Sequence, residues 1–169
     1  MSSLSSKNIA LLLCSGFDEQ PFVQLQQQLA AVGANVKVVS RDHGLTNGWA
    51  GETWGLSYPV DAALSETLAI DYDVMVIPDG QRHSDMLLND PHGMRVVSAF
   101  LREDVPSLVI GAAVTSLKEK NLLDDRDVAG DDITLDKMLV TAPSGADTAE
   151  MISTLSKAVQ AADEVEAAA

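Results

Sequence analysis

The chain has 169 residues, a formal charge of −14 and an isoelectric point near 4.3. This length suits one domain whose core needs no disulfide or metal. The negative charge repels phosphate backbones and anionic lipid headgroups, which argues against nucleic acid and membrane surfaces as partners. The chain starts without the pattern of a signal peptide, has no apolar run near the roughly 20 residues that span a bilayer, and contains a single cysteine, Cys14. We therefore expect a cytoplasmic protein.

Strands and helices are predicted to alternate along the chain. Short apolar runs typical of buried parallel strands span residues 9–14, 35–39, 73–77 and 107–110, and a last strand is expected over 137–141. Apolar side chains at helical spacing predict helices over residues 22–32, 91–101, 115–120 and 148–162.

Local signals add detail between these elements. Asp90 before Pro91 is typical of a helix start, and Gly33 of a helix end. The segment 44–58 contains Asn47-Gly48, a turn signal that predicts a hairpin or an irregular excursion there, and a short helix is expected to follow through Leu68. The acidic end, 163–169, is predicted to be a disordered tail.

The most informative segment is Gly111-Ala112-Ala113, which joins the strand 107–110 to the next helix. In α/β enzymes such an elbow presents a Cys or Ser beside a helix N-terminus, where the dipole favours a thiolate or an oxyanion. Glycine presents no side chain. The sequence therefore predicts an enzyme architecture without its usual nucleophile.

Four segments carry a family resemblance: Cys14-Ser-Gly-Phe-Asp-Glu19, Asp71-Tyr-Asp-Val-Met-Val-Ile-Pro-Asp-Gly80, Val109-Ile-Gly-Ala-Ala113 and Leu139-Val-Thr-Ala-Pro-Ser-Gly145. Together they resemble the ThiJ/PfpI family of the class I glutamine amidotransferase-like superfamily over nearly the whole chain. The resemblance implies a flavodoxin-like three-layer α/β/α sandwich with a mainly parallel sheet, and a homodimer. We expect one such domain over 8–162, after a flexible N-terminus, 1–7.

The departures from the family pattern concern its chemistry. The family's nucleophilic cysteine aligns with Gly111, and the acid that hydrogen-bonds this cysteine aligns with Pro21. Asp79 replaces a glycine near the oxyanion site, where its carboxylate would oppose a developing negative charge. No catalytic residue is therefore expected. The candidates for lining the vestigial pocket are Asp18, Glu19, Asp79, Gly80, His83, Gly111 and Ala112.

The remaining candidate residues have ordinary structural explanations beside functional ones. Cys14 at a strand end is expected to be buried and inert rather than a redox sensor. Helix capping explains Thr115 or Ser116 better than a replacement nucleophile does. The acidic run 124–132 lacks the ligand spacing of a calcium loop and is interpreted as solvated. Trp49 and Trp54 either pack on the domain or form a partner surface.

Three functions remain open. The pattern favours a non-catalytic ThiJ/PfpI-like protein, a homo-oligomeric binding or stress-associated module that uses no cofactor or metal. The first alternative is a hydrolase or lyase on small carbonyl compounds, of glyoxalase or deglycase type, with Asp18, Glu19 or His83 as general base. The second is a purely structural interaction domain. The expected partners are a second copy of the chain and a small-molecule ligand or a protein.

Overall fold

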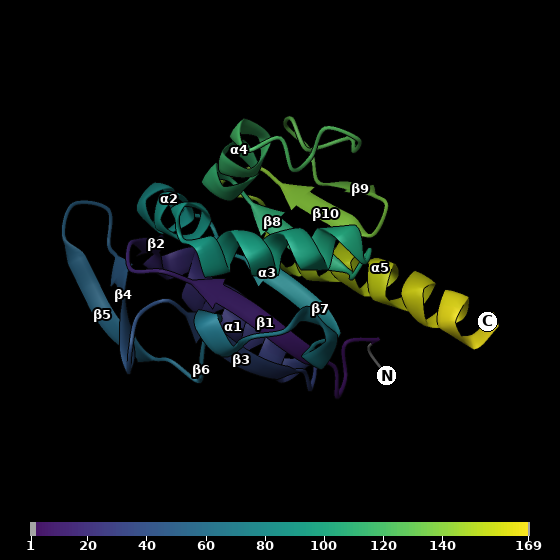
Figure 1. Cartoon of the computed structure of the whole chain (residues 1–169), viewed down its shortest axis with the longest axis horizontal. Coiled ribbons are helices and arrows are strands. Elements are labelled where there is room, and N and C mark those ends of the chain that lie inside the picture. Colours follow the sequence, from purple (N-terminus) through teal and green to yellow (C-terminus); the bar gives the residue numbers. More distant parts are fainter. Residues whose placement is uncertain (1–2, 169) are drawn as a thin grey trace.

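A seven-stranded sheet forms the middle layer of the computed structural model, which describes residues 3–168 (Figure 1). Its strands, in spatial order, are β6 (Ala62–Ala63), β3 (Asn35–Ser40), β1 (Asn8–Leu13), β7 (Val74–Ile77), β8 (Ser107–Ile110), β10 (Leu139–Ala142) and β9 (Thr134–Asp136). Neighbouring strands pair in parallel, except that β9 runs antiparallel to β10. The predicted strands are confirmed, and β9 is an addition within the polar stretch before the last of them.

Helices cover both faces of this sheet, so the predicted three-layer α/β/α sandwich is confirmed. On one face lie α1 (Glu19–Ala31) and α5 (Thr148–Ala168), and on the other α2 (Gln81–Asn89), α3 (Pro91–Arg102) and α4 (Ala112–Glu119). Alternate strand residues feed the two cores: Leu11 faces α1 and α5, whereas Leu12 faces the other three helices. Asp90 caps α3 as predicted, since its carboxylate accepts hydrogen bonds from the His92 and Gly93 backbone N–H groups.

A hairpin projects at one end of the molecule (Figure 1). It consists of β4 (Leu45–Trp49) and β5 (Trp54–Pro59), which join β2 (Phe17–Asp18) in a second sheet. The predicted hairpin is confirmed, but the predicted turn is wrong: Asn47 and Gly48 lie within β4, and the chain reverses between residues 49 and 54. Gly48 is needed there because a Cβ atom would collide with the Glu19 side chain.

Four other segments differ from the sequence prediction. The short helix expected before Leu68 is replaced by β6 and two 3₁₀ turns, Leu64–Glu66 and Ala69–Asp71. The helix α2 was not predicted. Residues 163–168 continue α5 where a disordered tail was expected, and the Lys7 ammonium bonds Asp163 at 2.9 Å. Leu4, in the N-terminal segment expected to be flexible, is buried. Residues 1, 2 and 169 of these two terminal segments lie outside the described residues.

Candidate functional site

The carboxyl ends of the central parallel strands meet at one edge of the sheet, which is where open α/β sheets place their ligands. Two backbone hydrogen bonds draw the loops of this edge together: Asp18 N–H donates to the Asp79 carbonyl at 2.9 Å, and Gly111 N–H donates to the Ala142 carbonyl at 2.8 Å. The four segments that carried the family resemblance thus reach a common region.

Gly111 forms the elbow between β8 and α4 and has φ 59° and ψ −119°. This positive φ is a region that glycine adopts without the steric penalty of a side chain. The elbow therefore keeps the backbone turn that presents a nucleophile in α/β enzymes, with no side chain on it. Gly111 also precedes the first residue of α4, so the backbone N–H of Ala112 points outward at the helix N-terminus.

The carboxylate of Asp79 fills the space that a side chain at Gly111 would need. Its Oδ1 accepts hydrogen bonds from the Gly80 and Ala112 backbone N–H groups, each at 2.8 Å, and Asp79 is only 7% exposed. A Cβ atom built on Gly111 would collide with the carboxyl group of Asp79. An anion at the N-terminus of a helix is electrostatically favourable. The sequence predicted that Asp79 would repel an anion here; in the structure its own carboxylate occupies the anion-binding N–H groups.

One hollow adjoins the Asp79 carboxylate, and a second lies beside Asp18. A pocket of about 130 Å³ is lined by Asp79, Pro21 and apolar side chains that include Phe22, Leu25 and Met151. A wider cleft of about 760 Å³, between the start of α1 and the hairpin, is lined by Asp18 and Glu19 and also by Pro21. Burial, and then the negative charge of Asp79, raise the pKa of Asp18 above its ordinary value. Asp18 and Asp79 are thus electrostatic neighbours of the same sign.

Glu19 ties the hairpin to the start of α1. Its carboxylate accepts a hydrogen bond from the Leu56 backbone N–H and lies against Gly48 and Gly55, where a Cβ atom would displace the Glu19 side chain. The side chain thereby satisfies a strand N–H, which is a structural role. It remains at the wall of the cleft.

His83 is fully buried at the start of α2 and links two strand ends. The Cys14 backbone N–H donates to its Nδ1 at 3.1 Å, which leaves Nε2 to donate to the Pro78 carbonyl at 2.6 Å. Burial lowers the pKa of His83 to about 4, so the ring is neutral at pH 7. Both ring nitrogens are engaged, and neither is placed to take a proton from a substrate.

The other candidate residues take structural positions. Cys14 is fully buried, and desolvation raises the pKa of its thiol to about 12, which disfavours the reactive thiolate. The capping interpretation of Thr115 and Ser116 is wrong, because α4 already begins at Ala112. In residues 3–168, no group of three or more His, Cys, Asp or Glu side chains could hold a metal ion, and no helix is long and apolar enough to cross a membrane.

The two tryptophans hold the hairpin against α2. Their rings meet edge to face with centroids 5.2 Å apart, and the guanidinium of Arg82 lies over both, 4.9 Å from Trp49 and 5.6 Å from Trp54. Such cation–π contacts explain the packing. Trp54 nevertheless stays 47% exposed, and Leu56 on the same hairpin is 68% exposed. The hairpin thus combines packing on the domain with an open apolar surface.

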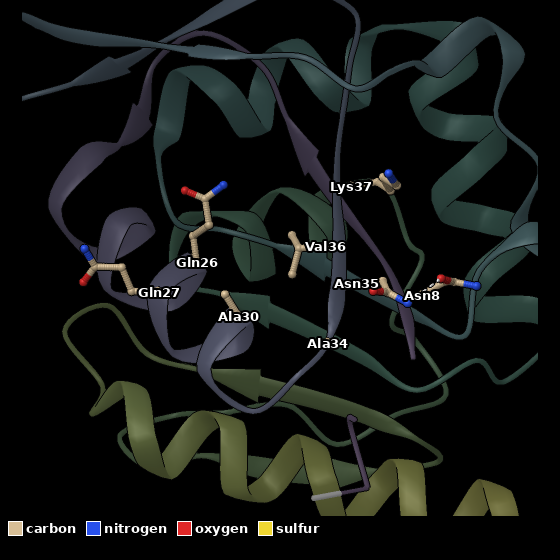
Figure 2. A pocket seen from close by; sticks show the side chains of 8 residues that line it. All are labelled: Asn8, Gln26, Gln27, Ala30, Ala34, Asn35, Val36 and Lys37. Carbon is tan, nitrogen blue, oxygen red and sulfur yellow. Dashed lines mark hydrogen bonds between the residues drawn. The ribbon is translucent and has the colours of Figure 1, made fainter. Parts of the chain in front are cut away.

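Figure 2 shows a further pocket, of about 740 Å³, that lies far from this chemistry. Asn8 and Asn35 are the first residues of β1 and β3, so the pocket opens at the amino ends of the strands, beside the α1 residues Gln26 and Gln27. The elbow and Asp79 lie at the opposite edge of the sheet. We therefore place the candidate site at the carboxyl edge because of its chemistry, since the wide hollows at the two edges have nearly the same volume.

The fold defines a mainly parallel α/β/α protein in which Gly111 forms the elbow between β8 and α4. The model of the DJ-1/PfpI family matches residues 7–167, and the chain belongs to this family. The resemblance to ThiJ/PfpI proteins is thereby confirmed. A comparison with curated proteins finds no significant match.

Several solved structures share the fold. A two-domain protein from Anabaena variabilis with DJ-1/ThiJ/PfpI-like and ferritin-like domains is 21% identical with a TM-score of 0.79; the match covers 89% of this chain and 47% of that one, about half its length. A cysteine-to-alanine mutant of a DJ-1 superfamily protein from Salmonella typhimurium is 19% identical with a TM-score of 0.78, covering 94% and 96%. Oxidized DJ-1 from Toxoplasma gondii is 16% identical with a TM-score of 0.74, covering 92% and 97%. These likenesses establish the fold alone.

Proposed function

We propose that this protein is a non-catalytic member of the DJ-1/PfpI family whose vestigial pocket serves binding. One observation carries the proposal: the Asp79 carboxylate occupies the space in front of Gly111 and takes both backbone N–H groups that would stabilise an oxyanion. A substrate carbonyl would have to displace a nearly buried carboxylate to reach them.

Three positions of the site support the absence of cysteine chemistry. Gly111 supplies no thiol, Pro21 supplies no acid beside it, and Cys14 is buried with a raised pKa. A nucleophile, its proton partner and its oxyanion donors are the three parts that covalent carbonyl chemistry needs. All three are absent from this site or already occupied.

One observation favours the alternative of a hydrolase or lyase with displaced chemistry. Asp18 lines the open cleft, and its raised pKa is a property that general bases share. Glu19 and His83, the other two candidate bases, are engaged in the hydrogen bonds described above. Asp18 is therefore the residue on which this alternative depends.

Methylglyoxal consumption by the purified protein decides between the two. We expect no saturable turnover by the unaltered protein, nor by its Asp18→Asn variant or the charge-matched surface variant Asp131→Asn. Saturable turnover that Asp18→Asn abolishes and Asp131→Asn preserves would replace the proposal by the enzymatic alternative.

We further infer a homodimeric, stress-associated module of the cytoplasm, with the exposed hairpin side chains Trp54 and Leu56 at the interface. Light scattering coupled to size exclusion tests this. A dimer that Trp54→Ser/Leu56→Ser converts to a folded monomer supports the inference, and a monomeric unaltered protein contradicts it. A dimer without any ligand would favour the purely structural alternative.

A further inference from the structure

Asp79 lines the small pocket, and its two carboxylate oxygens differ in their hydrogen bonding. Its Oδ1 holds the two backbone N–H groups, whereas no hydrogen bond or ion pair to Oδ2 occurs within residues 3–168. Oδ2 is not fully enclosed either, because Arg126 Nε is the only fully enclosed polar side-chain atom without a partner in residues 3–168. A nearly buried carboxylate therefore keeps an open acceptor, which is a position for a hydrogen-bond donor.

The walls of this pocket are apolar and carry no positive charge. They comprise Pro21, Phe22, Gln24, Leu25, Pro78, Ile110, Gly145, Ala146, Thr148 and Met151, besides Asp79 itself. The Thr148 hydroxyl donates a hydrogen bond to the Gln24 side-chain oxygen at 3.4 Å, so these two polar lining residues partly satisfy each other's hydrogen-bonding groups. The pocket thus combines one anionic oxygen with an apolar interior.

A second carboxylate, that of Asp18, lies near enough to feel the charge of Asp79, although it does not line the pocket itself. Asp18 lines the adjoining cleft, which shares Pro21 and Gln24 with the pocket, and its side chain forms no ion pair or hydrogen bond among the described residues. Two neighbouring carboxylates with restricted access to water and no counter-ion are unfavourable, and the raised pKa of Asp18 reflects this cost. A bound cation would offset the repulsion between them.

We propose that the pocket binds a primary ammonium group on a short alkyl chain, with the ammonium between Asp79 Oδ2 and Asp18 and the chain against Phe22, Leu25 and Met151. The proposal rests on the proposed function, because a pocket with a catalytic thiol would select carbonyl compounds. Its volume of about 130 Å³ corresponds to about four groups of the size of a water molecule. A four-carbon chain with its ammonium at the rim fits this space.

Calorimetric titration with three probes of equal chain length tests the charge preference in the unaltered protein. We expect n-butylammonium to bind at least tenfold more tightly than n-butanol, and butyrate to bind most weakly, because a charge-assisted hydrogen bond to Asp79 is open only to the cation. Butyrate or butanol binding as tightly as n-butylammonium would overturn the proposal, and so would no binding of n-butylammonium.

Variants locate the site. Asp79→Asn keeps an oxygen acceptor for the Gly80 and Ala112 N–H groups but loses the charge, so n-butylammonium affinity should fall at least tenfold. Asp18→Asn, in the adjoining cleft, should lower it severalfold even if Asp79→Asn does not fold. Asp131→Asn removes the same charge at an exposed position outside the pocket and should change nothing. Equal affinity in Asp18→Asn and Asp131→Asn would contradict the assignment.

A titration with one more probe distinguishes a lysine side chain from a free amine as the source of the ammonium group. Nα-acetyl-lysine amide that binds as tightly as n-butylammonium identifies a lysine side chain as the occupant, and exclusion of this probe identifies a free amine. The methylglyoxal assay is independent of these titrations: turnover would refute the proposed function, whereas failure of n-butylammonium to bind refutes only this inference.

Discussion

Restoring a cysteine at the elbow should destabilise the protein unless Asp79 is removed as well. In Gly111→Cys, the new Cβ would collide with the Asp79 carboxyl group, so this carboxylate must leave the Gly80 and Ala112 N–H groups. The variant also places a side chain on a residue with φ 59°. The structure thus predicts a steric and a conformational cost together.

The size of this effect follows from its parts. Two hydrogen bonds to a charged acceptor contribute about 1.5–3 kcal/mol each, and the strained elbow costs about 1–3 kcal/mol. Gly111→Cys should therefore lower the free energy of unfolding by about 4–9 kcal/mol, a large part of the stability of a typical domain. Asp79→Gly alone loses the same two hydrogen bonds.

The double variant Asp79→Gly/Gly111→Cys loses those hydrogen bonds only once and has no collision. Its cost should therefore be smaller than the sum of the two single costs by about 3 kcal/mol or more, a coupling free energy that urea unfolding of all four proteins measures. Gly111→Ala serves as the control that introduces a Cβ without a thiol and should show the same coupling to Asp79→Gly. Costs that add within about 0.5 kcal/mol would refute the placement of the carboxylate.

Three further outcomes are expected. The folded-state pKa of His83 lies at about 4, below its ordinary 6.5, so unfolding takes up a proton between these values; stability is complete above pH 6.5 and should fall by about 3 kcal/mol towards pH 4. Urea midpoints should show a weaker pH dependence in His83→Gln than in the unaltered protein, and equal pH dependence in the two would contradict this. Burial raises the folded-state pKa of Asp18, so its ionised form opposes folding; Asp18→Asn should stabilise the protein at pH 7 by well under 1 kcal/mol, given solvent screening, and the gain should vanish below pH 3.8. Equal midpoints at pH 7 would contradict this. Asp90→Ala should cost about 1 kcal/mol, since it removes the side-chain acceptor for two N–H groups at the start of α3, and thermal unfolding checks it.

The fold could be predicted because its signals are local. Buried parallel strands appear as short apolar runs. The adjacent residues Asp90 and Pro91 are enough to predict the start of α3. The elements that were not predicted lack such signals. The helix α2 begins after Gly80 with no side-chain cap. The end of α5 has no sequence feature to announce the Lys7–Asp163 contact, which joins residues 156 positions apart.

The candidate site was predicted only in part, because its decisive contact joins two loops. The absence of a nucleophile at Gly111 can be read directly from the sequence, and so can a carboxylate at Asp79. The Asp79 carboxylate fills the space beside Gly111 only because the ends of β7 and β8 lie close together, and this distance cannot be read from the sequence. The family resemblance implied one signal, a side chain lost at position 111 and one gained at position 79, as expected for two positions that share a volume.

Methylglyoxal consumption by stepwise restored variants tests the central claim most directly. The unaltered protein and Pro21→Glu/Gly111→Cys should be inactive, because the Asp79 carboxylate remains opposite the elbow. Asp79→Gly/Pro21→Glu/Gly111→Cys should gain saturable turnover. Turnover by the unaltered protein, or full activity of the double variant with Asp79 in place, would contradict the claim that this carboxylate occupies and silences the former catalytic site.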